Sequence, residues 1–176
     1  ITNGHLSVLN SAARLFDKVI VGVAADNNKK TLFTLEERTK LAEASTGHLS
    51  NVVVQEFSGL LVDFAKEQNA SALVRGLRVV SDFEYEMQMA MFNKDLNGEL
   101  ETVFFIADAE HSFISSSQVR NIASLGGSID KYVSQPVADA LKAKYQKIEK
   151  TNNTIVVILM VLIALLIVLY LVLIIS

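Results

Sequence analysis

Four short runs of apolar, largely β-branched residues punctuate the first part of the chain, and longer amphipathic stretches separate them. The runs occupy residues 19–25, 52–57, 72–74 and 102–107. Continuous apolar character over so few residues is typical of strands buried on both faces of a parallel sheet. The alternation therefore predicts an α/β fold with a doubly wound parallel sheet, in which ligands bind at the carboxyl ends of the strands.

Helix boundaries are marked between these runs. Thr34 with Glu37, and Ser81 with Glu84, each have the spacing of a capping box, and Gly126 follows an amphipathic stretch as a C-cap would. A further amphipathic stretch covers residues 5–16. Residues 1–148 together have the size of one ordinary domain.

Composition excludes several functional classes. A net charge of -3 is too acidic for a protein that binds nucleic acid by neutralising phosphates. The chain has no cysteine, which excludes disulfides, thiolate metal sites and a cysteine nucleophile. Asp82, Glu84 and Glu86 are spaced at two, so they do not share one helix face as a metal-binding pair would. We therefore predict no nucleic-acid partner and no metal site built by the protein.

The C-terminal segment has a different character. All 16 basic and 19 acidic residues precede Thr151, and from 155 to 175 every residue is apolar except Tyr170. These residues would form about 31 Å of helix, which matches a bilayer core. The sequence predicts a single C-terminal transmembrane helix over 155–175 after a juxtamembrane linker over 149–154. An engineered or misassembled fusion is the alternative origin of this tail.

Basic residues precede the apolar segment, and none follows it. Lys142, Lys144, Lys147 and Lys150 are offset only by Glu149. The positive-inside rule then predicts a cytoplasmic domain tethered to the membrane.

The chain also opens with an unusual feature. Thr2, Asn3, Gly4 and His5 form a polar stretch that runs at once into the first amphipathic segment. In an α/β protein such a polar turn normally follows a strand. We therefore expect a first strand to be missing upstream of Ile1.

Candidate phosphate-binding groups are distributed along the domain, although G-x-x-x-x-G-K-[ST] and G-x-G-x-x-G are both absent. His5 opens a helix, where backbone N–H groups and an imidazole suit a phosphoryl oxygen. The serine triplet 115–117 opens another helix and adds hydroxyl donors. Arg75 and Arg78 leave the strand at 72–74, and Lys29 belongs to a lysine pair after the first strand. The combination predicts a polyphosphate site.

Taken singly, each group has a more ordinary explanation. A histidine at a helix start is more often a cap, a serine triplet is more often a simple N-cap, and a lysine pair in a loop is usually solvated. His111 adjoins the serine segment and is expected to line the same site. The prediction depends on these groups converging in space.

Five motifs in one register, from Ile1 to about Lys144, resemble bacterial phosphopantetheine adenylyltransferases. Residues 1–5 look like the T/HxGH motif of that family. The other matching segments are the lysine loop with residues 33–38, residues 57–61, residues 75–78 with 82–86, and residues 112–117.

The resemblance implies a Rossmann-like fold and transfer of the adenylyl group of ATP to 4'-phosphopantetheine with Mg2+, in a homo-oligomer that is a hexamer in the family. It implies that His5 stabilises the transition state, that Lys29 bridges the two reacting phosphates, and that Arg75 and Leu61 bind phosphopantetheine. The residues implied to bind ATP are His5, Gly76, Leu77, Arg78, Glu86, His111, Ser112, Phe113, Ile114, Ser115, Ser116 and Ser117.

Two departures from the family keep alternatives open. The family has a first strand and a G-[ST]-F-D-P turn ahead of these motifs, and it has no apolar tail. One alternative is a membrane-tethered nucleotide-binding module that is catalytically impaired. Another retains catalysis but uses a different acceptor, as in related cytidylyl or nicotinamide-nucleotide transferases.

Overall fold

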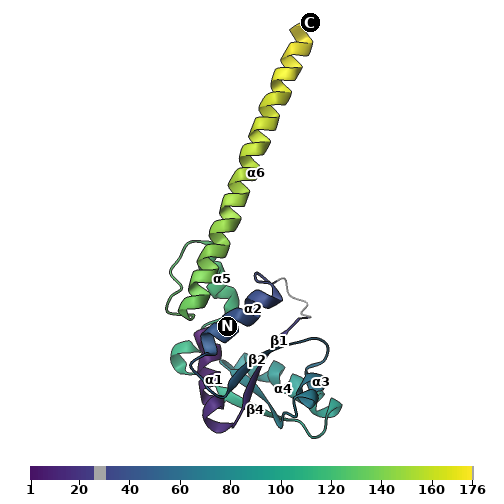
Figure 1. Ribbon diagram of the computed structural model, residues 1–176, viewed down its shortest axis with the longest axis vertical. Coiled ribbons are helices and arrows are strands. Elements are labelled where there is room, and N and C mark those ends of the chain that lie inside the picture. Colours follow the sequence, from purple (N-terminus) through teal and green to yellow (C-terminus); the bar gives the residue numbers. More distant parts are fainter. Residues whose placement is uncertain (26–30, 176) are drawn as a thin grey trace.

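Helices and strands alternate from residue 3 to residue 106, and helical elements follow (Figure 1). The computed structural model describes the backbone of residues 1–25 and 31–175, and the side chains of these residues except 80, 81 and 164–175. The elements are α1 (Asn3–Leu15), β1 (Val19–Ala24), α2 (Leu35–Thr46), β2 (Val52–Phe57), α3 (Leu61–Glu67), β3 (Ala72–Leu77), α4 (Val80–Leu96), β4 (Glu101–Ile106), the 3-10 turn η1 (Ala109–His111), α5 (Ser116–Ser124) and α6 (Gln135–Ile175).

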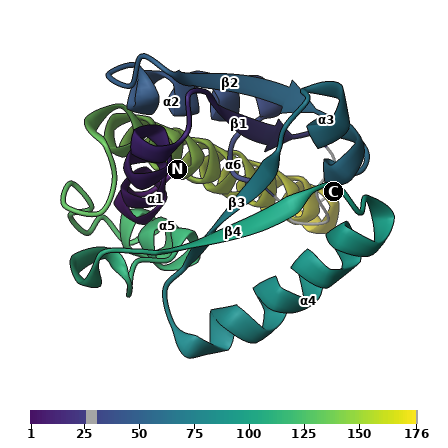
Figure 2. The same ribbon diagram turned by 90° about the horizontal axis from the view of Figure 1, so that it is seen from below.

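The four strands form two parallel pairs. β1 pairs with β2, with Val19 opposite Val52, and β3 pairs with β4, with Ala72 opposite Glu101. The predicted α/β class and parallel pairing are confirmed, but the strands make two two-stranded sheets rather than one continuous sheet. Within residues 1–25 and 31–175, no strand joins β1 to β3. The helix α1 contacts both pairs instead (Figure 2).

β3 is longer than the apolar run that predicted it. The run ends at Val74, whereas the strand continues through Arg75 and Gly76 to Leu77. Pairing with β4, where Arg75 lies opposite Phe104, holds these residues in extended conformation. Arg75 therefore projects from within the strand, and only Arg78 lies beyond its carboxyl end.

Two of the three predicted helix boundaries are correct. Thr34 and Glu37 form the capping box at the start of α2. Gly126 has φ +75° just after α5, and the hydrogen bond from Gly127 N to Ile122 O completes a Schellman-type end. The predicted cap at Ser81 is wrong, because the N-cap of α4 is Val79 and Ser81 already lies inside the helix.

The largest buried cluster joins α5 to the base of α6. Its members are Ile114, Val119, Ala123, Ile129, Val133, Val137, Ala138 and Leu141. Burying each large aliphatic side chain of this kind contributes about 1.5–3 kcal/mol before entropy is counted. The cluster fixes the residues that precede α5, because Ile114 is part of it and is 4% exposed.

The predicted transmembrane helix over 155–175 is wrong. Among the helices that the structure describes, none is long and apolar enough to cross a membrane. The tail instead ends the 41-residue helix α6, which begins at the domain and extends away from it (Figure 1). The side chains of residues 164–175 lie outside the described residues. The cytoplasmic orientation that the lysines predicted depended on this membrane span, so it is not supported either.

Candidate active site

The first turn of α1 places His5 at the carboxyl end of the β3–β4 pair. Thr2 is the N-cap of the helix, and its backbone N–H donates to Nδ1 of His5 at 3.1 Å. The Thr2 hydroxyl lies 2.8 Å from the same nitrogen. Because Nδ1 accepts the backbone hydrogen bond, the neutral ring carries its proton on Nε2. His5 is therefore oriented as a hydrogen-bond donor through Nε2.

The surroundings of His5 favour the neutral ring. Burial lowers the pKa most, and the positive charges of the Ile1 amino group, Arg78 and Arg75 lower it further, to about 4. His5 is nevertheless an exposed residue, so a ligand can reach its side chain. All four contributions have the same sign, so at pH 7 His5 is a neutral donor placed among cations.

Arg75 reaches α4 from the middle of β3. Its Nε donates to Glu86 Oε2 at 2.6 Å and its Nη2 donates to Glu86 Oε1 at 2.8 Å. The pairing is bidentate, which fixes the plane of the guanidinium group. The Arg75 side chain remains 41% exposed, so its outer face can meet an anionic ligand while Glu86 holds its inner edge.

Arg78 joins two segments that are distant in sequence. Its Nε donates to Asp82 Oδ2 at 3.0 Å, and its Nη1 donates to the Ile114 carbonyl at 3.0 Å. The first contact is on α4, and the second lies just before α5. Arg78 therefore couples the start of α4 to the serine segment.

Gly76 lets α1 pass close to β3. A methyl group at this position would approach Cγ2 of Val8 to 2.7 Å, which is closer than atoms can pack. The absence of a side chain at Gly76 therefore sets how near α1 lies to the strand end. Leu77 completes the strand, and its carbonyl accepts from Ala107 N at 2.9 Å.

The serine segment is organised as a helix cap. Ser115 is the N-cap of α5 and accepts from Gln118 N at 3.2 Å. Its hydroxyl also donates to Gln118 Oε1 at 2.7 Å and lies 3.1 Å from Ser117 Oγ. Ser116 is the first residue of α5. The hydroxyls of Ser115 and Ser117 thus find partners within the segment, which forms the start of α5.

His111, Ser112 and Phe113 bridge η1 and the serine segment. The His111 carbonyl lies 3.4 Å from where a Cβ at Gly4 would be, so η1 and the first turn of α1 are adjacent. Ser112 Oγ donates to the Ala109 carbonyl at 2.9 Å. Phe113 is 62% exposed and its ring meets Tyr132 edge-on at 6.2 Å.

Two predicted site residues are not part of this group. Leu61 begins α3 and packs on the buried cluster of Val62, Ala65, Leu73 and Leu100. The helix follows β2 in the chain, and the cluster joins it to Leu73 of β3. Lys29 lies outside the described residues.

Sequence reasoning missed two side chains of the site. Thr2 is 3% exposed and orients His5, and Asp82 holds Arg78. The signal for Thr2 was present, since a threonine three residues ahead of a side-chain acceptor is the spacing of a helix cap. Asp82 belongs to the matched segment 82–86, but its spacing from Glu84 and Glu86 gave it no role in the sequence analysis.

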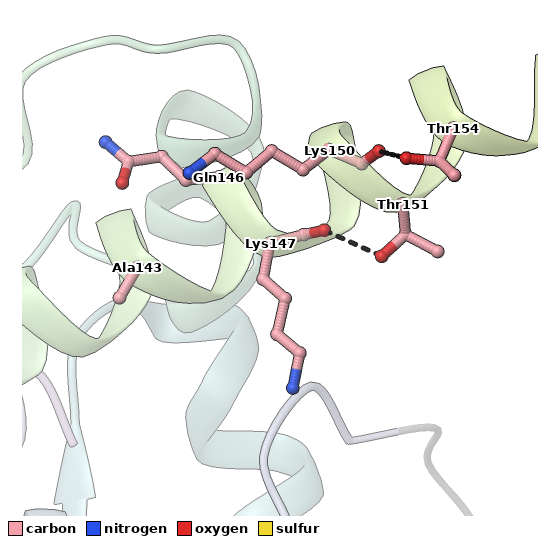
Figure 3. A pocket seen from close by; sticks show the side chains of 6 residues that line it. All are labelled: Ala143, Gln146, Lys147, Lys150, Thr151 and Thr154. Carbon is pink, nitrogen blue, oxygen red and sulfur yellow. Dashed lines mark hydrogen bonds between the residues drawn. The ribbon is translucent and has the colours of Figure 1, made fainter. Parts of the chain in front are cut away.

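Two hollows of the surface lie away from His5. One runs along α6 and is lined by that helix alone, between Ala143 and Thr154 (Figure 3). There the hydroxyls of Thr151 and Thr154 donate to the carbonyls of Lys147 and Lys150. Another lies at the carboxyl end of β2, between residues 55–58 and the end of α3. Neither hollow includes an arginine, a histidine or a serine of the predicted phosphate site.

Known proteins show clear relationships to this chain. A family model described as cytidylyltransferase-like matches residues 1–122. A phosphopantetheine adenylyltransferase of Moorella thermoacetica is 55% identical over 145 residues, which cover 82% of this chain and 91% of that protein. The fold is similar to that of a Vibrio parahaemolyticus protein provisionally assigned as a nicotinate-nucleotide adenylyltransferase, with a TM-score of 0.56. That structure is 19% identical and covers 80% of this chain and 83% of its own, so it supports the fold alone.

Proposed function

The chain belongs to the phosphopantetheine adenylyltransferase family, and we propose that it transfers the adenylyl group of ATP to 4'-phosphopantetheine, giving dephospho-coenzyme A and pyrophosphate. The resemblance found in the sequence motifs is thus confirmed at the level of the family. The reaction belongs to coenzyme A biosynthesis, and the enzyme is a nucleotidyltransferase.

The observation that carries the proposal is the state of His5. The backbone N–H of Thr2 donates to Nδ1, so the proton is on Nε2, and desolvation together with the nearby positive charges lowers the pKa of the ring and favours its neutral form. A neutral donor beside two guanidinium groups suits a phosphoryl oxygen that gains negative charge in the transition state. A general base is not required for this role.

In the proposed reaction, a phosphate oxygen of 4'-phosphopantetheine attacks the α-phosphorus of ATP in line. The new P–O bond forms as the bond from the α-phosphorus to the β-phosphate oxygen breaks, and pyrophosphate departs. His5 donates to the α-phosphate oxygen in the transition state, while Arg75 holds the attacking phosphate. Positioning and charge stabilisation supply the rate enhancement.

ATP is proposed to lie between the end of β3 and the start of α5. The contact from Arg78 to the Ile114 carbonyl joins these two segments, and η1 lies against α1 beside them. The backbone N–H groups at the start of α5 favour anionic phosphates. Gly76, Leu77 and residues 111–117 would then surround the nucleotide, with Glu86 holding Arg75 rather than the ligand itself.

Lys29 and Leu61 enter the proposal by position in the family motifs. Lys29 would bridge the two reacting phosphates. Leu61 would lie beside the pantetheine arm, near the hollow at the end of β2. Their contribution is a prediction of the motifs, whereas that of His5, Arg75 and Arg78 also has support from geometry.

Magnesium is proposed to arrive with ATP. Among the described residues no cluster of three or more His, Asp or Glu side chains could hold a metal ion. The nearby carboxylates of Asp82 and Glu86 are occupied by Arg78 and Arg75. Mg2+ commonly binds through substrate phosphates with few protein ligands, so the Mg2+ complex of ATP fits this site as the substrate.

A homo-oligomer, hexameric as in the family, is also proposed. Several large apolar side chains of α4 are exposed, among them Phe83, Tyr85, Met87, Met91 and Phe92. These side chains lie on more than one side of α4, and so much exposed apolar surface on one helix favours burial against another chain. Light scattering on the purified protein and on Met91→Glu tests this, and a monomeric wild-type protein would contradict it.

The experiment that tests the function is pyrophosphate release with a panel of acceptors. The purified chain is incubated with Mg2+ and ATP or CTP, and with 4'-phosphopantetheine or nicotinate mononucleotide. We expect release only with ATP and 4'-phosphopantetheine together, and its loss in His5→Ala. Turnover with nicotinate mononucleotide would assign a different acceptor, and ATP binding without any release would indicate a nucleotide-binding module.

A further inference from the structure

Ser7 and Asp108 make a hydrogen-bonded contact across 101 positions of the sequence. Ser7 Oγ donates to Asp108 Oδ2 at 2.7 Å and accepts from Asp108 N at 3.3 Å. Ser7 is 8% exposed, so its hydroxyl is largely removed from water, whereas Asp108 lies at the surface. The contact is bidirectional, since each residue both donates to and accepts from the other.

The two residues belong to the two segments that must meet around the nucleotide. Ser7 lies on α1, two positions after His5. Asp108 follows β4 and begins η1, where its carbonyl accepts from His111 N at 2.8 Å. Ser7 thus links the helix that carries His5 to the segment that carries His111 and leads to Ser115.

Packing on the same face of α1 is close but does not by itself fix the helix in every direction. Gly4 lies three residues before Ser7 and is close to His111. Val8 lies four residues after Gly4 and is close to Gly76. Apolar and van der Waals contacts are non-directional, so they resist approach more than rotation or sliding. A hydrogen bond has preferred distances and angles, and it therefore specifies the register.

We propose that Ser7 and Asp108 are a positioning pair that sets the register of α1, and with it the Nε2 donor of His5, against the nucleotide-binding segment 109–117. The inference rests on the proposed function. Neither residue touches the reacting atoms in this arrangement, and the pair acts through His5 and η1. Among the described residues, it is the one residue pair whose side-chain hydrogen bonds join α1 to residues 107–117.

The pair is suited to a test by exchange. One partner must supply a hydroxyl, and the other must supply a carboxylate. The double variant Ser7→Asp with Asp108→Ser keeps both groups, and an aspartate at position 7 could still accept from the backbone N–H of residue 108. Ser7→Asp alone places two carboxylates opposite each other, and Asp108→Ser alone places two hydroxyls opposite each other.

We expect Ser7→Ala and Asp108→Ala to lower kcat by roughly tenfold, because misplacement of a catalytic group by about 1 Å can cost up to about 100-fold. The KM for ATP should change by less than about threefold. Each single exchange should be similarly slow, and the double exchange should return to within about threefold of the wild-type kcat. Ser128→Ala, which removes a hydroxyl bonded to Asp130 at 3.2 Å on the loop after α5, is the matched control and should leave kcat unchanged.

Thermal unfolding of every variant separates positioning from folding. If the pair only stabilises the fold, the single variants melt earlier but keep the wild-type kcat per folded molecule, and the inference is overturned. A folded double exchange that remains as slow as the singles also overturns it. If the double exchange does not fold, Asp108→Asn retains an acceptor oxygen and should be clearly faster than Asp108→Ala; equal rates count against the inference.

The wild-type measurement separates this inference from the proposed function. A wild-type chain without turnover contradicts the function, and the positioning role falls with it. An active wild-type chain whose variants fail to show the rescue contradicts the positioning role alone.

Discussion

The starts of α1 and α2 have the same local arrangement and different uses. Each helix has a threonine N-cap, and the side chain three residues later accepts a hydrogen bond from the backbone N–H of that threonine. The distance is 3.1 Å from Thr2 N to Nδ1 of His5, and 2.8 Å from Thr34 N to Oε2 of Glu37. The capping geometry is therefore shared, while the third residue differs.

The residue type at that third position decides what else the cap can do. Glu37 uses its carboxylate to accept from Lys144 Nζ at 2.9 Å, which joins α2 to α6. His5 has a second ring nitrogen, and the cap fixes the proton on it. The cap of α2 therefore stabilises the contact between α2 and α6, whereas the cap of α1 orients a hydrogen-bond donor. A cap at the carboxyl end of strands becomes a candidate catalytic group when its side chain has a second polar atom facing the ligand.

The largest expected effect is that of removing the ring. His5→Ala should lower kcat by about 100- to 1000-fold, the usual cost of losing one transition-state donor, while the Kd for ATP stays within about threefold. Steady-state pyrophosphate release and calorimetric ATP binding measure the two quantities. Glu37→Ala is the matched control and should keep its turnover. A similar loss of ATP affinity in His5→Ala would mean that the ring binds the ground state.

A smaller effect is expected at the N-cap of α1. Thr2→Ala removes the hydroxyl 2.8 Å from Nδ1 but retains the backbone hydrogen bond, so the ring should lose part of its orientation. We expect kcat to fall roughly tenfold, with Thr2→Ser close to wild type. Stopped-time assays at saturating ATP suffice. Equal activity of the alanine and serine variants would show that the backbone bond alone orients the ring.

The equivalent change in α2 should affect stability and leave catalysis intact. Thr34→Ala removes the acceptor of the Glu37 N–H, and loss of such a cap costs about 1 kcal/mol, or about fivefold in the folding equilibrium. Urea unfolding followed by circular dichroism measures the change. A fall in kcat as large as that of Thr2→Ala would remove the distinction between the two helix starts.

The smallest effect concerns pH. His5 has its pKa lowered from the ordinary 6.5 to about 4, so the neutral donor persists until the pH approaches that value. We expect kcat to be level between about pH 5.5 and 8 and to be halved near pH 4. A half-maximal point near pH 6.5 would show that the ring is solvated like a free imidazole.

Stability should fall on acidification at both helix starts. Between about pH 6.5 and 4 the unfolded chain protonates His5 while the folded chain does not, so stability decreases as the pH falls through this window. Hydrogen bonding to Lys144 lowers the pKa of Glu37 below 4.5, and its contribution is likewise lost as the pH falls. Glu37→Gln should weaken the second effect and leave the pH dependence of kcat unchanged.

Local patterns predicted the elements of the fold well. Apolar β-branched runs located all four strands, and capping residues located the starts of α2 and α5. These signals depend on interactions between neighbours in sequence, which the chain itself encodes. The predictions failed where the sequence gives no local signal: β3 continues past Val74 because β4 pairs with Arg75, Gly76 and Leu77, and α4 begins after Val79, ahead of Ser81.

The tail shows the limit of a composition argument. A run of apolar residues gave a length that fits a bilayer, but the run is the continuation of a helix that begins among the domain's own residues. Among the described residues, no helix is long and apolar enough to cross a membrane. The packing of this helix against α5, in the buried cluster at its base, became visible only in three dimensions.

Sequence by itself determined which residues could do chemistry, because side-chain type and order along the chain are local properties. It predicted that His5, Lys29, Arg75, Arg78 and the serine triplet form a phosphate site, and it indicated the family. Only the tertiary structure decided which nitrogen of His5 carries the proton, that Glu86 and Asp82 hold the two arginines, and that Ser7 meets Asp108. These features depend on distances of a few ångströms between segments up to 101 positions apart, and such distances are set by how helices pack on strands.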